Sequence, residues 1–197
     1  KNLINGLAEK GDKVFVYGKP TGRNYQFLSS GITQRKFPVT KIGVLLNPIY
    51  LFLMLFISQP HLCLTLGRQV WQNSKSWSQF LHRLCRILPP LLDNLDIFHI
   101  QWAKMLVEYP EFVEGLNCPI VLSLRGTHIN VSPVINEKLA ISYRQYFPKL
   151  NGFHAVSRAI AEETEKYGAD ISKITIINPA VNEKLLNYKA DKVNNLD

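Results

Sequence analysis

A chain of 197 residues, of which 46% are hydrophobic and 19% charged, has the composition of a folded globular domain, which excludes a disordered chain and a fibrous repeat. The three cysteines, Cys63, Cys85 and Cys118, lie far apart and form no C-x-x-C pair, so the sequence predicts neither a disulfide framework nor a thiolate zinc site and favours a reducing compartment. The net charge of +8 is concentrated, because residues 13–92 contain ten Lys or Arg and no Asp or Glu. Such a block favours an anionic partner: nucleic acid, a membrane surface or an anionic substrate.

The predicted elements alternate between helix and strand. Residues 2–10 have the pattern of a helix that ends at Gly11, and we expect further chain before Lys1. A strand is predicted at 14–18, a short β-rich run that ends at Gly18. Further strands are predicted at 96–100, 119–124, 152–156 and 174–178, each apolar on both alternating faces, which is typical of buried parallel strands. Helices are predicted at 103–116 with an interruption at Pro110, at 136–146, and at 158–167 between an N-cap at Ser157 and Gly168. This order predicts a doubly wound α/β layer.

Residues 42–92, a basic and apolar helical segment, fit this alternation least well. Residues 42–58 carry no charge but fall short of the ~20 residues needed to span a bilayer, and Asn47-Pro48 makes a good helix start, so we expect a helix over 48–57 that does not span. An amphipathic helix is predicted from Trp77, Phe80, Leu81, Leu84 and Leu88, with Lys75, His82, Arg83 and Arg86 on the other side. This helix either packs on the core with a solvated basic face or lies on an anionic membrane. Because residues 13–92 contain no Asp or Glu, we favour the two interpretations equally.

Polar, cationic and small residues follow the predicted strands, at the edge where open α/β sheets bind ligands. In chain order these residues are Gly18, His99, Gln101, Trp102, Arg125, Gly126, Thr127, His128, Ser157, Arg158 and Asn178-Pro179. Together they favour an anionic, hydroxyl-rich ligand.

Several of these residues also have a structural interpretation. His128, in a loop beside Arg125, is the candidate for proton transfer, whereas His99 and His154 lie within strands and are expected in the core. Gly126 either supplies a positive φ or lets a ligand approach the backbone, and Ser157 caps a helix whose free N–H groups suit a phosphate or carboxylate. The spacing of the histidines predicts no metal site. Serine-hydrolase, P-loop and dinucleotide-binding motifs are absent from the sequence.

Three segments resemble a known family in their order and spacing. They are LDIFHIQWA, CPIVLSLRGTHI and NGFHAVSRAIAEETEKYGADISKITIINPAVN. From Ile4 to about Glu183 the chain resembles the amino-terminal half of family 4 glycosyltransferases, which are retaining enzymes of the GT-B fold.

The resemblance implies both a fold and an activity. Residues 1–183 would form a Rossmann-like acceptor-binding domain without its first strand, and 184–197 would link it to a carboxyl-terminal domain that binds the donor. A nucleotide sugar would be the co-substrate, with no further cofactor, and the acceptor would be a glycan or a lipid-linked molecule. We expect a cytoplasmic protein, peripheral on the anionic inner face of the membrane, and no activity from these residues alone.

The chain departs from the family pattern at the site. Arg125 stands where the histidine of H-G-x-D is usual, His128 where its aspartate is usual, and Gln101 where the second histidine of H-x-H is usual. Cations in these places favour an acceptor that carries negative charge. Two alternatives are a non-catalytic Rossmann-like binding module and, less favoured because the aromatic residues lie in apolar runs, a nucleic-acid binder.

Overall fold

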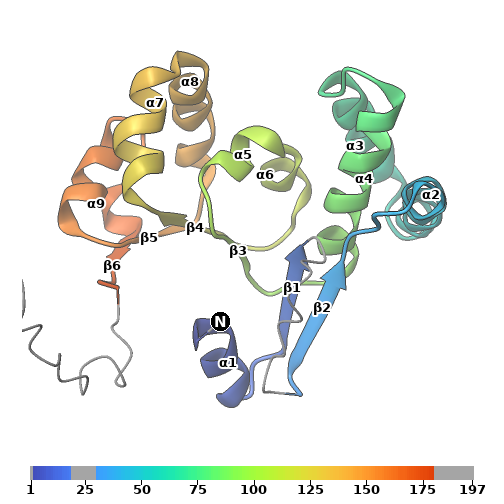
Figure 1. The fold of residues 1–197 in the computed structure, drawn as a ribbon, viewed down its shortest axis with the longest axis horizontal. Coiled ribbons are helices and arrows are strands. Elements are labelled where there is room, and N and C mark those ends of the chain that lie inside the picture. The colour runs from blue at the N-terminus through green and yellow to red at the C-terminus, as the bar shows by residue number, and fades with distance from the viewer. Residues whose placement is uncertain (1, 19–29, 180–197) are drawn as a thin grey trace, which may run out of the picture. The chain divides into compact units, whose positions relative to one another are not determined.

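The computed structural model describes residues 2–18 and 30–179. The chain divides into two compact units: Lys1–Phe98 with Met105–Ile120 form the first unit, and His99–Lys104 with Val121–Asp197 form the second. Figure 1 shows strands that alternate with helices along the chain, which is the α/β, Rossmann-like organisation that the sequence predicts. The predicted linker at 184–197 and the domain boundary at 183 lie outside the described residues.

The first unit begins with a helix and a pair of parallel strands. Helix α1 (Asn2–Glu9) is followed by Gly11 at a φ of +96°, which confirms the predicted helix end. Strand β1 (Val14–Gly18) pairs in parallel with β2 (Ile32–Lys36). The sequence analysis missed β2 because its polar residues, ITQRK, lack the apolar run that marked the other strands. Strand β1 is half-buried along its whole length.

Helix α2 (Lys41–Ser58) is longer than predicted. The predicted start at Asn47 and Pro48 is wrong, because Thr40 caps the helix: its hydroxyl accepts a hydrogen bond from the Gly43 N–H at 3.1 Å. A side-chain cap this early leaves Pro48 inside the helix instead of at its first position.

A thiol compensates for the proline inside α2. Pro48 has no N–H, so it cannot donate the helical hydrogen bond to the carbonyl of Val44. The Cys85 thiol, on α4 (Trp77–Leu92), lies 3.8 Å from that carbonyl oxygen and donates in its place. Burial raises the pKa of Cys85 to about 11, so the thiol keeps its proton at neutral pH.

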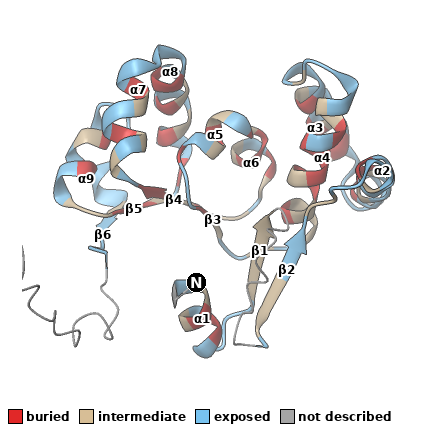
Figure 2. Ribbon diagram, viewed as in Figure 1, coloured by how far each residue is buried: buried red, intermediate tan, exposed pale blue. Residues whose placement is uncertain are grey.

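The outer side of α2 is apolar and exposed, as the pale blue ribbon in Figure 2 shows. Its exposed residues include Ile42, Leu46, Ile49, Tyr50, Leu53, Phe56 and Ile57. By length and composition α2 could cross a membrane, and only 17% of it is buried within the protein. Its inner side contacts α4, where Val44 packs against Leu81 and Cys85.

Helix α4 has the predicted amphipathic pattern, with one correction. Leu81, Leu84 and Leu88 are buried, which agrees with the interpretation that this side packs on the core, whereas Trp77 is exposed. Arg83, however, does not belong to a solvated basic face: it is 9% exposed, and its Nη2 donates to both carboxylate oxygens of the buried Glu111, at 2.6 and 2.8 Å. An internal carboxylate from a distant part of the sequence therefore turns this arginine inward.

Three further helices complete the first unit, of which α3 and α6 pack on α4. They are α3 (Pro60–Gln72), α5 (Lys104–Glu108), which belongs to this unit from Met105 on, and α6 (Glu111–Gly115). The break between α5 and α6 at Pro110 confirms the predicted interruption. Their core consists of Leu55, Cys63, Leu66, Val70, Leu84, Ile87, Leu88, Tyr109 and Phe112.

The second unit is organised around a four-stranded sheet. The strands are β3 (Phe98–Ile100), β4 (Ile120–Leu124), β5 (Gly152–Ala155) and β6 (Ile174–Ile176), and they lie in this order. Strand β5 pairs in parallel with β4 and with β6. Four of the five residues of β4 are buried, whereas β6, the edge strand among the described strands of this sheet, is half-buried to exposed.

The helices of the second unit confirm two predictions and add an unpredicted turn. Helix α8 (Glu137–Tyr146) is capped by Asn136, and α9 (Arg158–Glu165) is capped by Ser157 and followed by Gly168 at a φ of +83°. A π-helical turn, η1 (Thr127–Val131), follows β4 and leads into α7 (Ser132–Ile135). Such turns often occur at functional sites.

Candidate functional site

Three neighbouring strands of the second unit place polar side chains side by side. His99 lies on β3, Ser123 on β4 and His154 on β5, and the register sets Ser123 directly opposite His154. Ser123 is buried, whereas the two imidazoles are half-buried. Buried polar groups of this kind need hydrogen-bond partners, and here they supply one another.

The hydrogen bonds among these residues have one direction when both imidazoles are neutral. The Ile177 carbonyl can only accept, so Nε2–H of His154 donates to it at 3.2 Å. Nδ1 of His154 then accepts from the Ser123 hydroxyl at 3.2 Å. Because that hydroxyl has only one proton, its oxygen accepts from Nε2–H of His99 at 2.9 Å.

The same chain continues outward to a cation. Nδ1 of His99 is left as an acceptor, and the Gln101 amide nitrogen lies 3.3 Å from it. The amide must therefore point its oxygen the other way, where Oε1 accepts from Nη2 of Arg125 at 3.4 Å. A chain of hydrogen bonds thus runs from the carbonyl after β6, across the sheet, to the Arg125 guanidinium.

The pKa of His99 agrees with these assignments. Burial lowers it below the ordinary value of histidine, and electrostatic interactions with the neighbouring His154 and with the Arg125 guanidinium lower it further. His99 is therefore neutral at physiological pH, as the hydrogen bonds from Gln101 and to Ser123 require.

Trp102 contacts two candidate residues of the loop after β4, Arg125 and His128. The Arg125 guanidinium carbon lies 4.9 Å from the centroid of the indole ring, a cation–π contact. The His128 imidazole meets the same indole edge-on, with centroids 5.0 Å apart. The buried Tyr143 hydroxyl donates to the His128 carbonyl at 3.2 Å and so holds the π-helical turn.

The loop after β4 also lies beside the start of α9. Gly126 has a φ of −42°, so of its two interpretations the positive φ is wrong, and close approach of a ligand to its backbone stays a prediction. A side chain added at Gly126 would meet only Ile160 Cδ1, at 3.9 Å, in the first turn of α9. Ser157 caps this turn, because its hydroxyl accepts from the Ile160 N–H. Arg158, the first residue of α9, is exposed.

The structure therefore brings together most of the predicted site residues. His99, Gln101, Arg125 and His128 are linked through direct contacts or through Trp102, and Gly126 and the exposed Thr127 lie in the same loop. Gly18 is the exception, because it ends β1 in the two-stranded sheet of the first unit.

Sequence reasoning missed three participants in this group. Ser123 attracted no attention inside an apolar strand, His154 was assigned to the core, and Trp102 was noted without a role. A polar residue at the same position of adjacent strands was the available signal, but it needed the register between β4 and β5. Within the described part of the chain, no group of three His, Cys, Asp or Glu side chains is placed to hold a metal ion.

Comparison with known proteins identifies the family. The family model described as Glycosyltransferase Family 4 matches residues 1–185. Comparisons with characterised proteins and with solved structures return no significant match. The family implies a nucleotide-sugar donor and an acceptor substrate. With its parallel α/β sheets and a match over nearly its whole length, the chain belongs to glycosyltransferase family 4, of which it forms the N-terminal domain.

Proposed function

We propose that the second unit binds the acceptor of a retaining glycosyltransferase at the carboxyl ends of β3, β4 and β5, and that this acceptor carries a negative charge. The observation that carries the proposal is that Arg125 is exposed and held in place without an ion-pair partner among the described residues. Its guanidinium is exposed and held by Gln101 and Trp102, and no carboxylate of the described residues forms an ion pair with it. A positioned arginine with free donors suits a carboxylate or phosphate of the acceptor.

In this proposal His128 accepts the proton of the reacting hydroxyl. Its ring nitrogens form no hydrogen bond with any described residue, so a ligand can reach them. The acceptor oxygen forms a bond to the anomeric carbon of the donor sugar on the same face from which the nucleotide phosphate departs, so that the configuration of this carbon is retained while its bond to the phosphate breaks. The hydroxyl proton goes to an imidazole nitrogen of His128, as general base catalysis requires. A carboxyl-terminal domain would hold the nucleotide.

Matched substitutions in the full-length enzyme test this site. Arg125→Ala should raise the KM for acidic acceptors about tenfold or more, because a charged hydrogen bond contributes about 1.5–3 kcal/mol, and Arg125→Lys should restore only part of the affinity. His128→Ala should lower kcat by about 10²–10⁴. Arg144→Ala is the control, because Arg144 stacks similarly on Tyr167, with its guanidinium carbon 5.9 Å from the ring centroid.

Two results would contradict the proposed site. One is normal turnover of acceptors by both alanine variants. The other is unfolding of either variant, which would make Arg125 and His128 part of the scaffold. The residues to examine next would then be His99 and Arg158.

We further propose that the protein acts on a lipid-linked or glycan acceptor as a peripheral protein of the inner membrane face. The exposed apolar side of α2, the exposed Arg68 of α3 and the half-buried Arg86 of α4 support this proposal. The packing of Val44 on Leu81 and Cys85 favours an interfacial position, because a spanning α2 would have to leave these partners.

Flotation with phosphatidylglycerol vesicles tests the membrane proposal. We expect the protein to float with the vesicles and to be released by high salt. Retention in both high salt and carbonate, with release only in detergent, would show instead that α2 spans the bilayer.

A further inference from the structure

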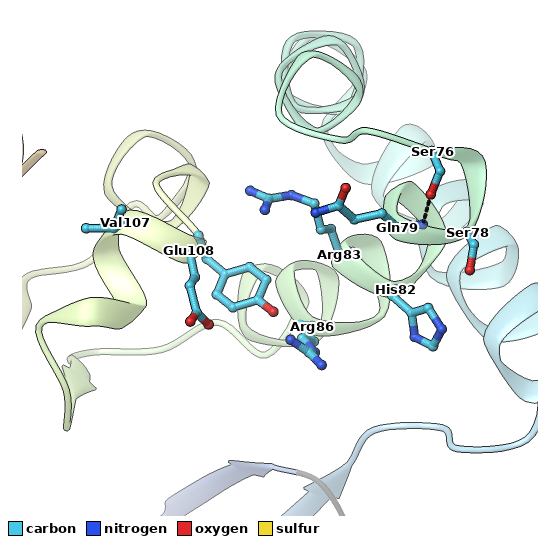
Figure 3. A pocket seen from close by; sticks show the side chains of 9 residues that line it. Ser76, Ser78, Gln79, His82, Arg83, Arg86, Val107 and Glu108 are labelled. Carbon is cyan, nitrogen blue, oxygen red and sulfur yellow. Dashed lines mark hydrogen bonds between the residues drawn. The ribbon is translucent and has the colours of Figure 1, made fainter. Parts of the chain in front are cut away.

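A cleft in the first unit lies along the first turns of α4. It has a volume of about 590 Å³ and is lined by Ser76, Ser78, Gln79, His82, Arg83, Arg86, Val107, Glu108 and Tyr109. Figure 3 shows the Arg83 side chain extending from α4 toward the segment of Val107 and Glu108. The volume falls within the range of small-molecule sites.

Two guanidinium groups of this cleft share one aromatic ring. The guanidinium carbons of Arg83 and Arg86 lie 5.2 and 5.4 Å from the centroid of the buried Tyr109 ring. Only one of the two guanidinium groups forms an ion pair with a described residue. Arg83 pairs with Glu111, whereas no carboxylate of the described residues pairs with Arg86.

Arg83 itself retains hydrogen-bonding capacity. Only its Nη2 is engaged by Glu111, and Asn73 donates to the same carboxylate at 3.0 Å, which fixes the pair. Nε of Arg83 is buried without a hydrogen-bond partner, and Nη1 has none among the described residues. An unpaired buried donor is costly, so a fixed arginine in this state is suited to an additional acceptor.

The amino-terminal end of α4 adds further donors to the same cleft. Ser76 caps the helix by accepting from the Gln79 N–H at 3.2 Å, and the Ser78 hydroxyl forms no hydrogen bond with the described residues. Helix amino termini carry partial positive charge, which adds to that of Arg86. The exposed His82 supplies another donor.

We propose that this cleft binds the phosphate group of an anionic ligand, in a site separate from the acceptor site of the second unit. Arg86 supplies a guanidinium that no described carboxylate pairs with, Arg83 supplies the remaining donors of its Nη1, and Ser78 and His82 supply additional donors, while the Glu108 carboxylate lines the same cleft. A phosphate uses such a set better than a carboxylate does, because it presents three or four oxygens instead of two. The phosphate is either that of a lipid headgroup or that of a soluble compound. The headgroup source rests on the proposed membrane binding, whereas phosphate binding itself does not.

Binding of soluble pyrophosphate tests the site directly. The full-length protein should show a thermal midpoint that rises with pyrophosphate concentration, because a ligand that binds only the folded state stabilises it. Arg86→Gln should abolish this rise. Arg68→Gln, which removes the same charge from an exposed position on α3 outside the cleft, should leave it intact. Arg83 is not substituted, since the loss of its pairing with Glu111 would itself destabilise the protein.

Vesicles that contain phosphatidylglycerol or only phosphatidylcholine distinguish the source of the phosphate. Loss of one basic charge near an anionic leaflet weakens partitioning about fivefold wherever the charge lies. Arg68→Gln should therefore show about this loss. If the cleft holds a headgroup, Arg86→Gln should lose about tenfold or more on phosphatidylglycerol vesicles.

Each outcome decides the proposal. A selective effect of Arg86→Gln in both assays supports a headgroup site, and a selective effect with pyrophosphate alone supports a soluble phosphate ligand. Equal effects of the two variants in both assays would refute the site and leave diffuse electrostatics. If the unsubstituted protein fails to bind vesicles but responds to pyrophosphate, the membrane proposal fails while the phosphate site stands.

Discussion

Replacing Ser123 by alanine should interrupt the hydrogen-bond chain at its centre. The substitution removes the 2.9 Å bond from His99 and the 3.2 Å bond to His154. A typical intramolecular hydrogen bond contributes about 1 kcal/mol net, so the expected loss is about 2 kcal/mol. The two imidazoles are half-buried and can regain some contact with water, which keeps the loss below that of two fully buried orphaned groups. For a chain of this size about 2 kcal/mol corresponds to a fall in Tm of ~4–8 °C.

Urea unfolding and Tm measurements check the size of this effect. Ser142→Ala is the control, because the Ser142 hydroxyl donates to the Lys138 carbonyl at 2.9 Å on the surface of the same unit, and its loss should cost less than ~0.5 kcal/mol. Nitrogen-15 NMR of the unsubstituted protein should also show the Nε2–H tautomer for both His99 and His154. In the full enzyme Ser123→Ala should raise the acceptor KM, because Gln101 and Arg125 lose their anchor.

Two findings would refute the reasoning about the chain. One is a Ser123→Ala variant as stable as Ser142→Ala with an unchanged acceptor KM. The other is an Nδ1–H tautomer of His154, which would reverse the direction of the bonds that the Ile177 carbonyl fixes.

Three further predictions concern charge, pH and space. Arg83→Gln should cost about 3 kcal/mol in urea unfolding, because it leaves the buried Glu111 carboxylate unpaired, and an Arg83→Met/Glu111→Leu double variant should recover most of that loss. The pKa of His99 is lowered in the folded state, so neutral His99 stabilises the fold fully above the ordinary histidine pKa. This contribution declines as the pH falls from that value toward the lowered pKa. The Tm measured from pH 7.5 to 5 should therefore fall less steeply in His99→Gln than in the unsubstituted protein. Gly126→Ala should leave Tm unchanged, since the added methyl group meets only Ile160 at 3.9 Å, but it should raise the acceptor KM if the ligand approaches this backbone.

The fold was predictable where local chemistry determined it. Apolar runs predicted the strands at 119–124 and 152–156. The N-cap residue Ser157 and the following Gly168 predicted the two ends of α9. Strand β2 was not predictable in this way, because its polar residues are held by hydrogen bonds to β1 and not by burial. The start of α2 was missed because Pro48 is an equally good first residue, and the partner that makes it tolerable in the interior, Cys85, is distant in sequence.

The candidate site was predictable as a location but not as a network. The rule that ligands bind at the carboxyl ends of parallel strands selected His99, Gln101, Arg125 and His128 without any knowledge of contacts. The roles of Ser123 and Trp102 depend on which side chains face one another across the sheet. This pairing follows from register and from the path of the loop after β4, neither of which any single segment encodes.

The π-helical turn after β4 makes the direction in which the side chains of this loop point depend on the number of residues in the turn. The Ser132 N–H reaches back five residues to the Thr127 carbonyl, so the turn holds one residue more than an α-helical turn would. Removing the exposed Asn130 would allow the same span to close as a regular α-helix, but it would rotate the residues ahead of the deletion relative to α7. His128 would then no longer face Trp102, although neither residue had been substituted. A single-residue deletion could therefore alter acceptor recognition in a way that substitutions at the site would not reveal.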